Sequence, residues 1–201
     1  MVGTLEPPGE RAKQERRRQI VTAAKAVFAE AGYRGASLAN ISERAGVTQS
    51  GLLHHFNSKE DLLLAVLEQH GLNDDALLLK PLGLGGSAVI GGLRDLVVEN
   101  AQNRVSVRLF AVLVAESTAV EHPGHDYMRE RYERLRNRLV GALSSGIERG
   151  EIRADVDLET LATSLIALMD GIQLQWIYDP DLDMGKAFDL VASVLTDAIR
   201  P

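Results

Sequence analysis

The 201-residue chain contains no cysteine, few aromatic residues (4%) and no long apolar run. The missing cysteine excludes disulfides, thiol catalysis and cysteine–zinc sites. No segment approaches the ~20 consecutive apolar residues that a membrane-spanning helix requires. The first twenty residues, MVGTLEPPGERAKQERRRQI, also lack the apolar centre of a secretory signal. These absences predict a cytoplasmic protein.

The net charge of −6 is unevenly distributed along the chain. Residues 1–60 carry nine lysines and arginines against six acidic residues, whereas residues 61–201 carry 13 against 22. A basic run at residues 11–18 opens the first helical pattern. It could contact phosphates, which attract cations without regard to sequence, or it could be an ordinary solvated helix start. Charge alone does not separate these alternatives.

The segment from Ser37 to Phe56, SLANISERAGVTQSGLLHHF, predicts two short helices joined by a tight turn. Leu38, Ile41 and Ala45 give the first helix one apolar face. Gly46 follows where the chain must bend, because glycine adopts positive φ at little cost.

Thr48 is a favourable N-cap for the second helix, and Thr48, Gln49 and Ser50 fall in its exposed first turn. Its buried side is expected to consist of Leu52, Leu53 and Phe56. A helix-turn-helix presents polar side chains to the DNA major groove in this way. The glutamine amide can pair bidentately with adenine, so Gln49 is the best candidate for reading sequence.

Periodicity predicts an all-α chain of about nine helices. The expected parts are a disordered tail at 1–12, a three-helix DNA-binding domain at 13–57, a connecting helix at 58–80 and a helical domain at 81–201. Gly71 and Asn73 predict the end of the helix that follows Ser58. The glycine-rich stretch at 80–92 predicts a flexible joint, since its partial dinucleotide-binding pattern lacks the flanking strands that such a site needs.

The sequence His122-Pro123-Gly124-His125-Asp126 could suggest a metal site. Its proline and glycine favour a helix-breaking turn with Asp126 as N-cap, and no third ligand lies nearby in sequence. No nucleophile elbow occurs and no carboxylate pair stands out. We therefore predict no catalytic residue, no metal and no cofactor.

The last two helical segments are apolar beyond a single face, which predicts a partner chain or a central position in the monomer. The residues expected at a dimer interface are Leu161, Leu165, Leu168, Ile172, Val191, Val194, Leu195 and Ala198.

Residues from about 17 to 67 resemble the DNA-binding domain of the tetracycline-repressor (TetR) family. The resemblance is carried by Ala23–Ala24, Val27–Phe28, Gly32–Tyr33, the run from Ile41 to Thr48, Leu52, His55–Phe56, Ser58–Glu60 and Leu62–Leu63. The remaining helices are similar in pattern to that family's effector and dimerisation bundle. The resemblance implies a dimeric repressor whose affinity for a DNA operator changes when a small molecule binds, and it implies no enzymatic activity.

The resemblance also implies roles for particular residues. Thr48, Gln49, Ser50 and Gly51 fall on base and groove contacts, His55 and Lys59 on backbone contacts, and Ser37 on a phosphate contact. Leu53 replaces a usual tyrosine phosphate contact, and Ala39 replaces a frequent polar contact. We expect His54 to substitute for the missing tyrosine.

The effector pocket is expected between the central helices. The candidate residues are Phe110, Leu113, Glu116, Met128, Tyr132, Met169, Gln173 and Trp176. Most could equally be core residues, and Glu116 and Gln173 could bond each other. Two rival functions are a helical enzyme with a cofactor at Gly83–Gly92 and a DNA-coating protein without an effector. The acidic second part argues against coating.

Overall fold

The computed structural model describes residues 8–201, apart from the side chains of Pro8, His70 and residues 72–79. That part of the chain forms nine α-helices and no strand, which confirms the predicted all-α class. The helices are α1 (Pro8–Gly35), α2 (Leu38–Ala45), α3 (Gln49–Leu53), α4 (Lys59–Leu84), α5 (Ala88–Asn100), α6 (Arg104–Glu116), α7 (His125–Glu148), α8 (Leu158–Tyr178) and α9 (Met184–Ile199).

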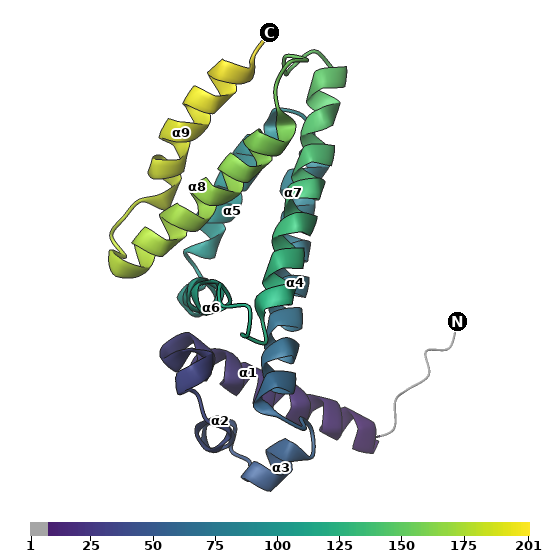
Figure 1. The fold of residues 1–201 in the computed structure, drawn as a ribbon, viewed down its shortest axis with the longest axis vertical. Coiled ribbons are helices and arrows are strands. Elements are labelled where there is room, and N and C mark those ends of the chain that lie inside the picture. The colour runs from purple at the N-terminus through teal and green to yellow at the C-terminus, as the bar shows by residue number, and fades with distance from the viewer. Residues whose placement is uncertain (1–7) are drawn as a thin grey trace, which may run out of the picture.

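Helices α1, α2 and α3 form a head at one end of the molecule (Figure 1). Helix α4 leads from the head into a body, where it packs against α5 and α7. Helices α8 and α9 complete that body, with α9 against α5 and α8. Helix α6 crosses beneath the body and packs along α1, so it is the main contact between body and head.

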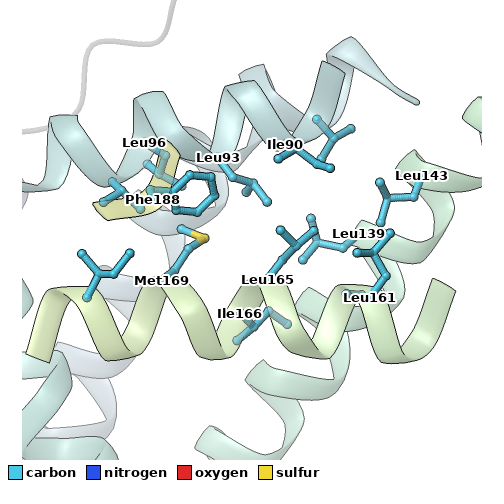
Figure 2. Packing of buried hydrophobic residues seen from close by; sticks show 14 of the residues in the cluster. Ile90, Leu93, Leu96, Leu139, Leu143, Leu161, Leu165, Ile166, Met169 and Phe188 are labelled. Carbon is cyan, nitrogen blue, oxygen red and sulfur yellow. The ribbon is translucent and has the colours of Figure 1, made fainter. Parts of the chain in front are cut away.

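Two apolar cores hold these parts together. In the body, Leu93, Leu139, Leu165 and Phe188 meet from four different helices, and all four are fully buried (Figure 2). Each such side chain contributes ~1.5–3 kcal/mol on burial. The second core joins the head to α4 and to the body helices α6 and α7. Its members include Ile20, Phe28, Ile41, Leu52, Leu62, Leu109, Leu113 and Met128.

The predicted tail is wrong for residues 8–12, because α1 already begins at Pro8. Proline suits a helix start, where its missing N–H leaves no hydrogen bond unmade. Residues 1–7 lie outside the described part of the chain. At Gly32 the helix α1 has a kink with φ 70°, and a further helical turn follows it to Gly35.

The predicted helix end at Gly71–Asn73 is also wrong, since α4 continues to Leu84. The predicted flexible joint is a short turn between α4 and α5, fixed by a 2.8 Å hydrogen bond from Gly86 N to Ala142 O. A Cβ on Gly92 would lie 2.7 Å from Pro81 Cα, so glycine here permits close packing of α5 on α4. The glycine content of residues 80–92 predicted flexibility, but in the structure the glycine at position 92 allows α5 to pack closely on α4.

The segment after α6 is a turn, as expected, but Asp126 is not its N-cap. Helix α7 starts at His125 with Gly124 in the cap position, and Asp126 lies in the first turn. The backbone N–H of Gly124 donates to His122 Nδ1 at 3.1 Å. Among the described residues no cluster of three potential ligands could hold a metal ion.

Candidate DNA-binding surface and effector cavity

Each helix of the predicted motif begins at a capping side chain, and Thr48 is the cap that the sequence predicts. Ser37 Oγ accepts a hydrogen bond from Asn40 N at 3.1 Å, and Thr48 Oγ1 accepts one from Gly51 N at 3.0 Å. Gly46 ends α2 in the left-handed conformation at φ 65°. These contacts satisfy helix-end amides and fix the angle at which α3 leaves α2.

Helix α3 is held from one side and open on the other. Leu52 and Phe56 are buried in the head core, whereas Gln49 and Ser50 are exposed. Leu53 was expected on the buried side, but it is 40% exposed. It faces outward because Leu52 and Phe56, four residues apart, form the buried side, and Leu53 lies ~100° around the helix from Leu52. The exposed edge of α3 is therefore mainly polar with one apolar residue.

A basic group lies beside the end of α3. The rings of His54 and His55 meet edge to face at 5.6 Å, and Arg17 lies 4.9 Å over the ring of Phe56. Burial, with the charges of His54, Lys13, Arg16 and Arg17, lowers the pKa of His55. Positive charges close enough to repel an imidazolium are close enough to attract a phosphate. The basic start of α1 thus lies next to the predicted DNA-binding residues.

Lys59 has a different environment from the one expected. Its Nζ donates to the carbonyl oxygens of Tyr33 at 2.9 Å and Ala36 at 3.0 Å, and it lies 4.5 Å over the Tyr33 ring. The resemblance implies a DNA-backbone contact for Lys59, whereas in the structure its ammonium bonds these internal carbonyl groups. Lys59 caps the end of α1 and ties α4 to the head.

A cavity of about 400 Å³ lies among the body helices α5, α6, α7 and α8 and reaches Lys25 of the head, and its volume is within the usual range for small-molecule sites. Of the expected ligand residues, Phe110, Met169 and Gln173 line it. Its polar lining also includes Lys25, Glu99, Asn100, Asn103, Ser106 and Asp170. The Asn100 amide donates to Gln173 Oε1 at 3.3 Å.

The other five expected residues do not line this cavity. Leu113 and Met128 are buried in the core shared with the head, and Trp176 belongs to the body core. Tyr132 is one step removed, because its hydroxyl donates at 2.7 Å to Asp170, which does line the cavity. Glu116 bonds the backbone of the head and not Gln173.

Sequence reasoning missed Lys25 and Asp170. Each is a lone charge in an apolar helical segment, VTAAKAVF and ALMDGI respectively. Charged residues in such settings are rarely buried without a partner or a ligand. The pocket was expected between the central helices, whereas Lys25 comes from α1.

The expected dimer residues fall into two groups. The interface prediction is wrong for Leu161, Leu165 and Ile172, because these side chains are buried in the core of the monomer. The apolar stripe of α8 faces α5 and α7, so it is not available to another chain. By contrast Val191 and Val194 on α9 are 37% and 62% exposed. Ala198 is exposed, and Leu168 and Leu195 are half-buried.

Comparison with known proteins identifies the chain. The profile described as "Bacterial regulatory proteins, tetR family" matches residues 20–66, and that described as "BetI-type transcriptional repressor, C-terminal" matches residues 91–200. The chain belongs to the TetR family. It is a DNA-binding transcriptional repressor. The matched profiles and relatives describe transcriptional regulators, not enzymes.

Two relatives and one solved structure illustrate the distance to known members. The chain is 28% identical to the probable regulator ArpR of Pseudomonas putida, covering 84% of this chain and 83% of ArpR. It is 29% identical to the repressor AcnR of Corynebacterium glutamicum, covering 77% and 78%. A TetR regulator from Chloroflexus aurantiacus superposes with a TM-score of 0.73 at 24% identity, covering 93% of this chain and 95% of that chain.

Among the described residues, no helix is long and apolar enough to cross a membrane.

Proposed function

We propose that this TetR-family protein acts in the cytoplasm as a homodimer that binds a near-palindromic operator through two copies of α3. The exposed polar edge of α3, fixed by the Thr48 cap, is the observation that supports this most. Gln49 reads bases, Thr48, Ser50 and Gly51 contact bases or the groove, and Ser37, His54 and His55 bind phosphates. Residues 13–57 then act as the DNA-binding unit, α4 connects it, and the body provides the effector site.

Dimerisation supplies the affinity that one short helix lacks. The apolar residues Leu190, Val191 and Val194 are exposed on α9, and Leu174 is exposed on α8. A two-fold dimer through this face buries them and places two α3 helices on one side of the DNA. Half-site centres should then be ~34–36 Å apart.

The effector acts from the cavity. A ligand shifts an equilibrium only by the difference between its affinities for the two states. A molecule that binds the cavity best when the two heads have a spacing unsuited to the operator therefore releases DNA. Helix α6 lines the cavity and packs on α1, so one helix contacts both the proposed effector site and the DNA-binding head.

The test is a selection of binding sites from random duplex DNA. The wild type should enrich a near-palindrome whose affinity falls steeply with salt. Gln49→Ala should relax the preference at one base pair per half-site and cost ~1–3 kcal/mol there. Asn137→Ala, an exposed amide on α7, is the matched control. If no sequence were enriched, a DNA-coating role would be favoured. If Gln49→Ala kept the wild-type sequence preference, Gln49 would not contact the bases.

His54 needs its own variant. If it substitutes for the phosphate-binding tyrosine, His54→Ala should weaken binding to all sequences about equally. Unchanged operator affinity would exclude the substitution.

A further inference from the structure

The cavity changes from apolar to polar at the same level on three helices. Along α5 the lining residues run from Leu93 and Leu96 to Asn100, and along α8 from Ile166 and Met169 to Gln173. Along α7 they run from Leu139 and Leu135 to Arg131. The 3.3 Å bond between Asn100 and Gln173 and the 2.7 Å bond between Tyr132 and Asp170 join these polar ends. The cavity is therefore amphipathic, with a defined polar end.

The polar end lies against the head. Ser106, near the start of α6, lines it, and so does Lys25 from α1. Lys25 Nζ donates to Ser106 Oγ at 2.6 Å across 81 residues of sequence. Helix α6 lies between the body and α1 (Figure 1). A molecule in this cavity thus reaches a side chain of the DNA-binding head itself.

Charges at the polar end favour an acceptor on the ligand. Lys25 and Arg131 are its cations, and Glu99 and Asp170 are its acids. Asp170 already accepts the Tyr132 hydroxyl, and the Arg131 guanidinium lies 4.3 Å over the Phe110 ring. Lys25 is half-buried with an ammonium group that can only donate. Because acids share this end, the requirement is an acceptor oxygen, which a carboxylate or a hydroxyl can provide.

We propose that Lys25 is part of the effector site and binds an acceptor oxygen on the head group of an amphipathic organic ligand. The inference rests on the proposed function in taking the cavity as the effector site. The ligand's apolar body occupies the inner end between α5, α7 and α8. Its head group competes with Ser106 for the Lys25 ammonium, so ligand binding loosens a bond that holds α1 to α6. Lys25 then determines ligand specificity and also couples the two sites.

Isothermal titration of the full chain, without DNA, tests the specificity. The probes are octanoate, octan-1-ol and octylammonium below their micellar concentrations, which share a chain and differ in head group. Octanoate and octan-1-ol should bind the wild type about tenfold or more tightly than octylammonium, which has only donors. Lys25→Met should abolish that preference and Lys25→Arg should keep it. Lys186→Met, which removes an exposed lysine on α9, should change nothing.

Several outcomes overturn the proposal. These are equal or tighter binding of octylammonium, an unchanged preference in Lys25→Met, and binding of none of the three probes. If circular dichroism shows that Lys25→Met does not fold, Lys25→Gln replaces the ammonium by a neutral amide that both donates and accepts, so it should reduce the preference for octanoate and octan-1-ol over octylammonium. An unchanged preference in Lys25→Gln would overturn the proposal.

The coupling is tested separately with the selected operator. Octanoate should weaken operator binding by the wild type and do so at least severalfold less in Lys25→Met, because coupling between two sites is reciprocal. Probe binding through Lys25 without any DNA binding would reject the proposed function and leave the specificity role standing. Operator release that is identical in Lys25→Met would reject the coupling role.

Discussion

The carboxylate of Glu116 accepts a 2.6 Å hydrogen bond from the backbone N–H of Tyr33. A second, longer bond of 3.5 Å comes from Arg34 N. Glu116 is the last residue of α6, and Tyr33 follows the kink of α1 at Gly32. An acidic side chain of the body thus satisfies the amides that the kink leaves without helical partners. Together with Lys25 and Ser106 it ties both ends of α6 to the head.

Removing this carboxylate should destabilise the protein. Glu116→Ala leaves the Tyr33 amide without its acceptor, which costs ~1–3 kcal/mol for a buried group and somewhat less where water can enter. Urea unfolding measures the change. Glu121→Ala removes an exposed carboxylate in the next loop and should leave the midpoint unchanged. Equal midpoints for the two variants would show that the bond does not stabilise the head.

A side chain at Gly32 should be strained by two independent features. The residue has φ 70°, and a Cβ would lie 2.6 Å from Glu116 Oε1. The backbone conformation alone, with φ 70° and ψ 176°, lies in a region that glycine occupies almost exclusively and costs another residue ~1–3 kcal/mol. Gly32→Ala should therefore lower the unfolding free energy by at least that amount. The double variant Gly32→Ala/Glu116→Ala should lose less unfolding free energy than the sum of the losses in the two single variants, because both substitutions affect the same contact.

Stability should decline in mild acid because of His122. Burial lowers the pKa of His122, although the nearby Glu116 opposes the shift and Arg34 adds to it. The unfolded chain therefore binds a proton more readily than the folded one, so this contribution is complete above the ordinary pKa of ~6.5 and is lost as pH falls below it. Its Nε2 is buried without a hydrogen-bond partner, 3.9 Å from Glu116 Oε2.

The measurement compares urea unfolding at pH 7.5 and 5.5. His122→Phe should reduce the loss of stability between the two pH values, whereas His54→Phe, at an exposed position, should not. Identical losses in wild type and His122→Phe would assign the pH dependence to other groups.

Local sequence rules predicted the head well, because its determinants lie close together in the chain. Gly46 and Thr48 act through backbone groups within three or four residues, and each has the predicted role. Ser37 caps α2 in the same local way, a role that was not predicted. The predicted burial of Leu53 is wrong, because Leu52 and Phe56 form the buried side and Leu53 lies ~100° around the helix from Leu52. Capping and turn chemistry therefore predict where α3 lies in the chain, but they do not predict which of its side chains are exposed.

Long-range contacts explain the remaining errors. Lys59 meets carbonyls 23 and 26 residues earlier, and Lys25 meets a hydroxyl 81 residues later. Leu161 belongs to an apolar stripe that periodicity detects, yet periodicity cannot tell a neighbouring helix from a second chain. Partners distant in sequence decide whether a charged or apolar side chain serves structure or function.

Lys59 should support the head without contacting DNA. Lys59→Met removes two hydrogen bonds from a charged donor, each with a net value of ~1.5–3 kcal/mol at most for this part-buried group, so stability should fall. The salt dependence of operator binding should keep its slope. Lys13→Met, at an exposed position beside His55, should reduce that slope by ~0.9 for each head, which is ~1.8 for the proposed dimer. A comparable reduction in Lys59→Met would establish a phosphate contact.

The exposed apolar face of α9 should determine the oligomeric state. Val194 is 62% exposed and follows Leu190, which is 70% exposed, by one helical turn. Val194→Glu should yield a folded monomer in analytical ultracentrifugation, because a carboxylate without a partner is costly to bury in an interface. Operator affinity should fall with it, since one head alone makes few contacts. Val120→Glu is the matched control, because Val120 is 72% exposed but lies after α6, outside α8 and α9. A dimer in Val194→Glu, or a monomer in Val120→Glu, would place the interface elsewhere.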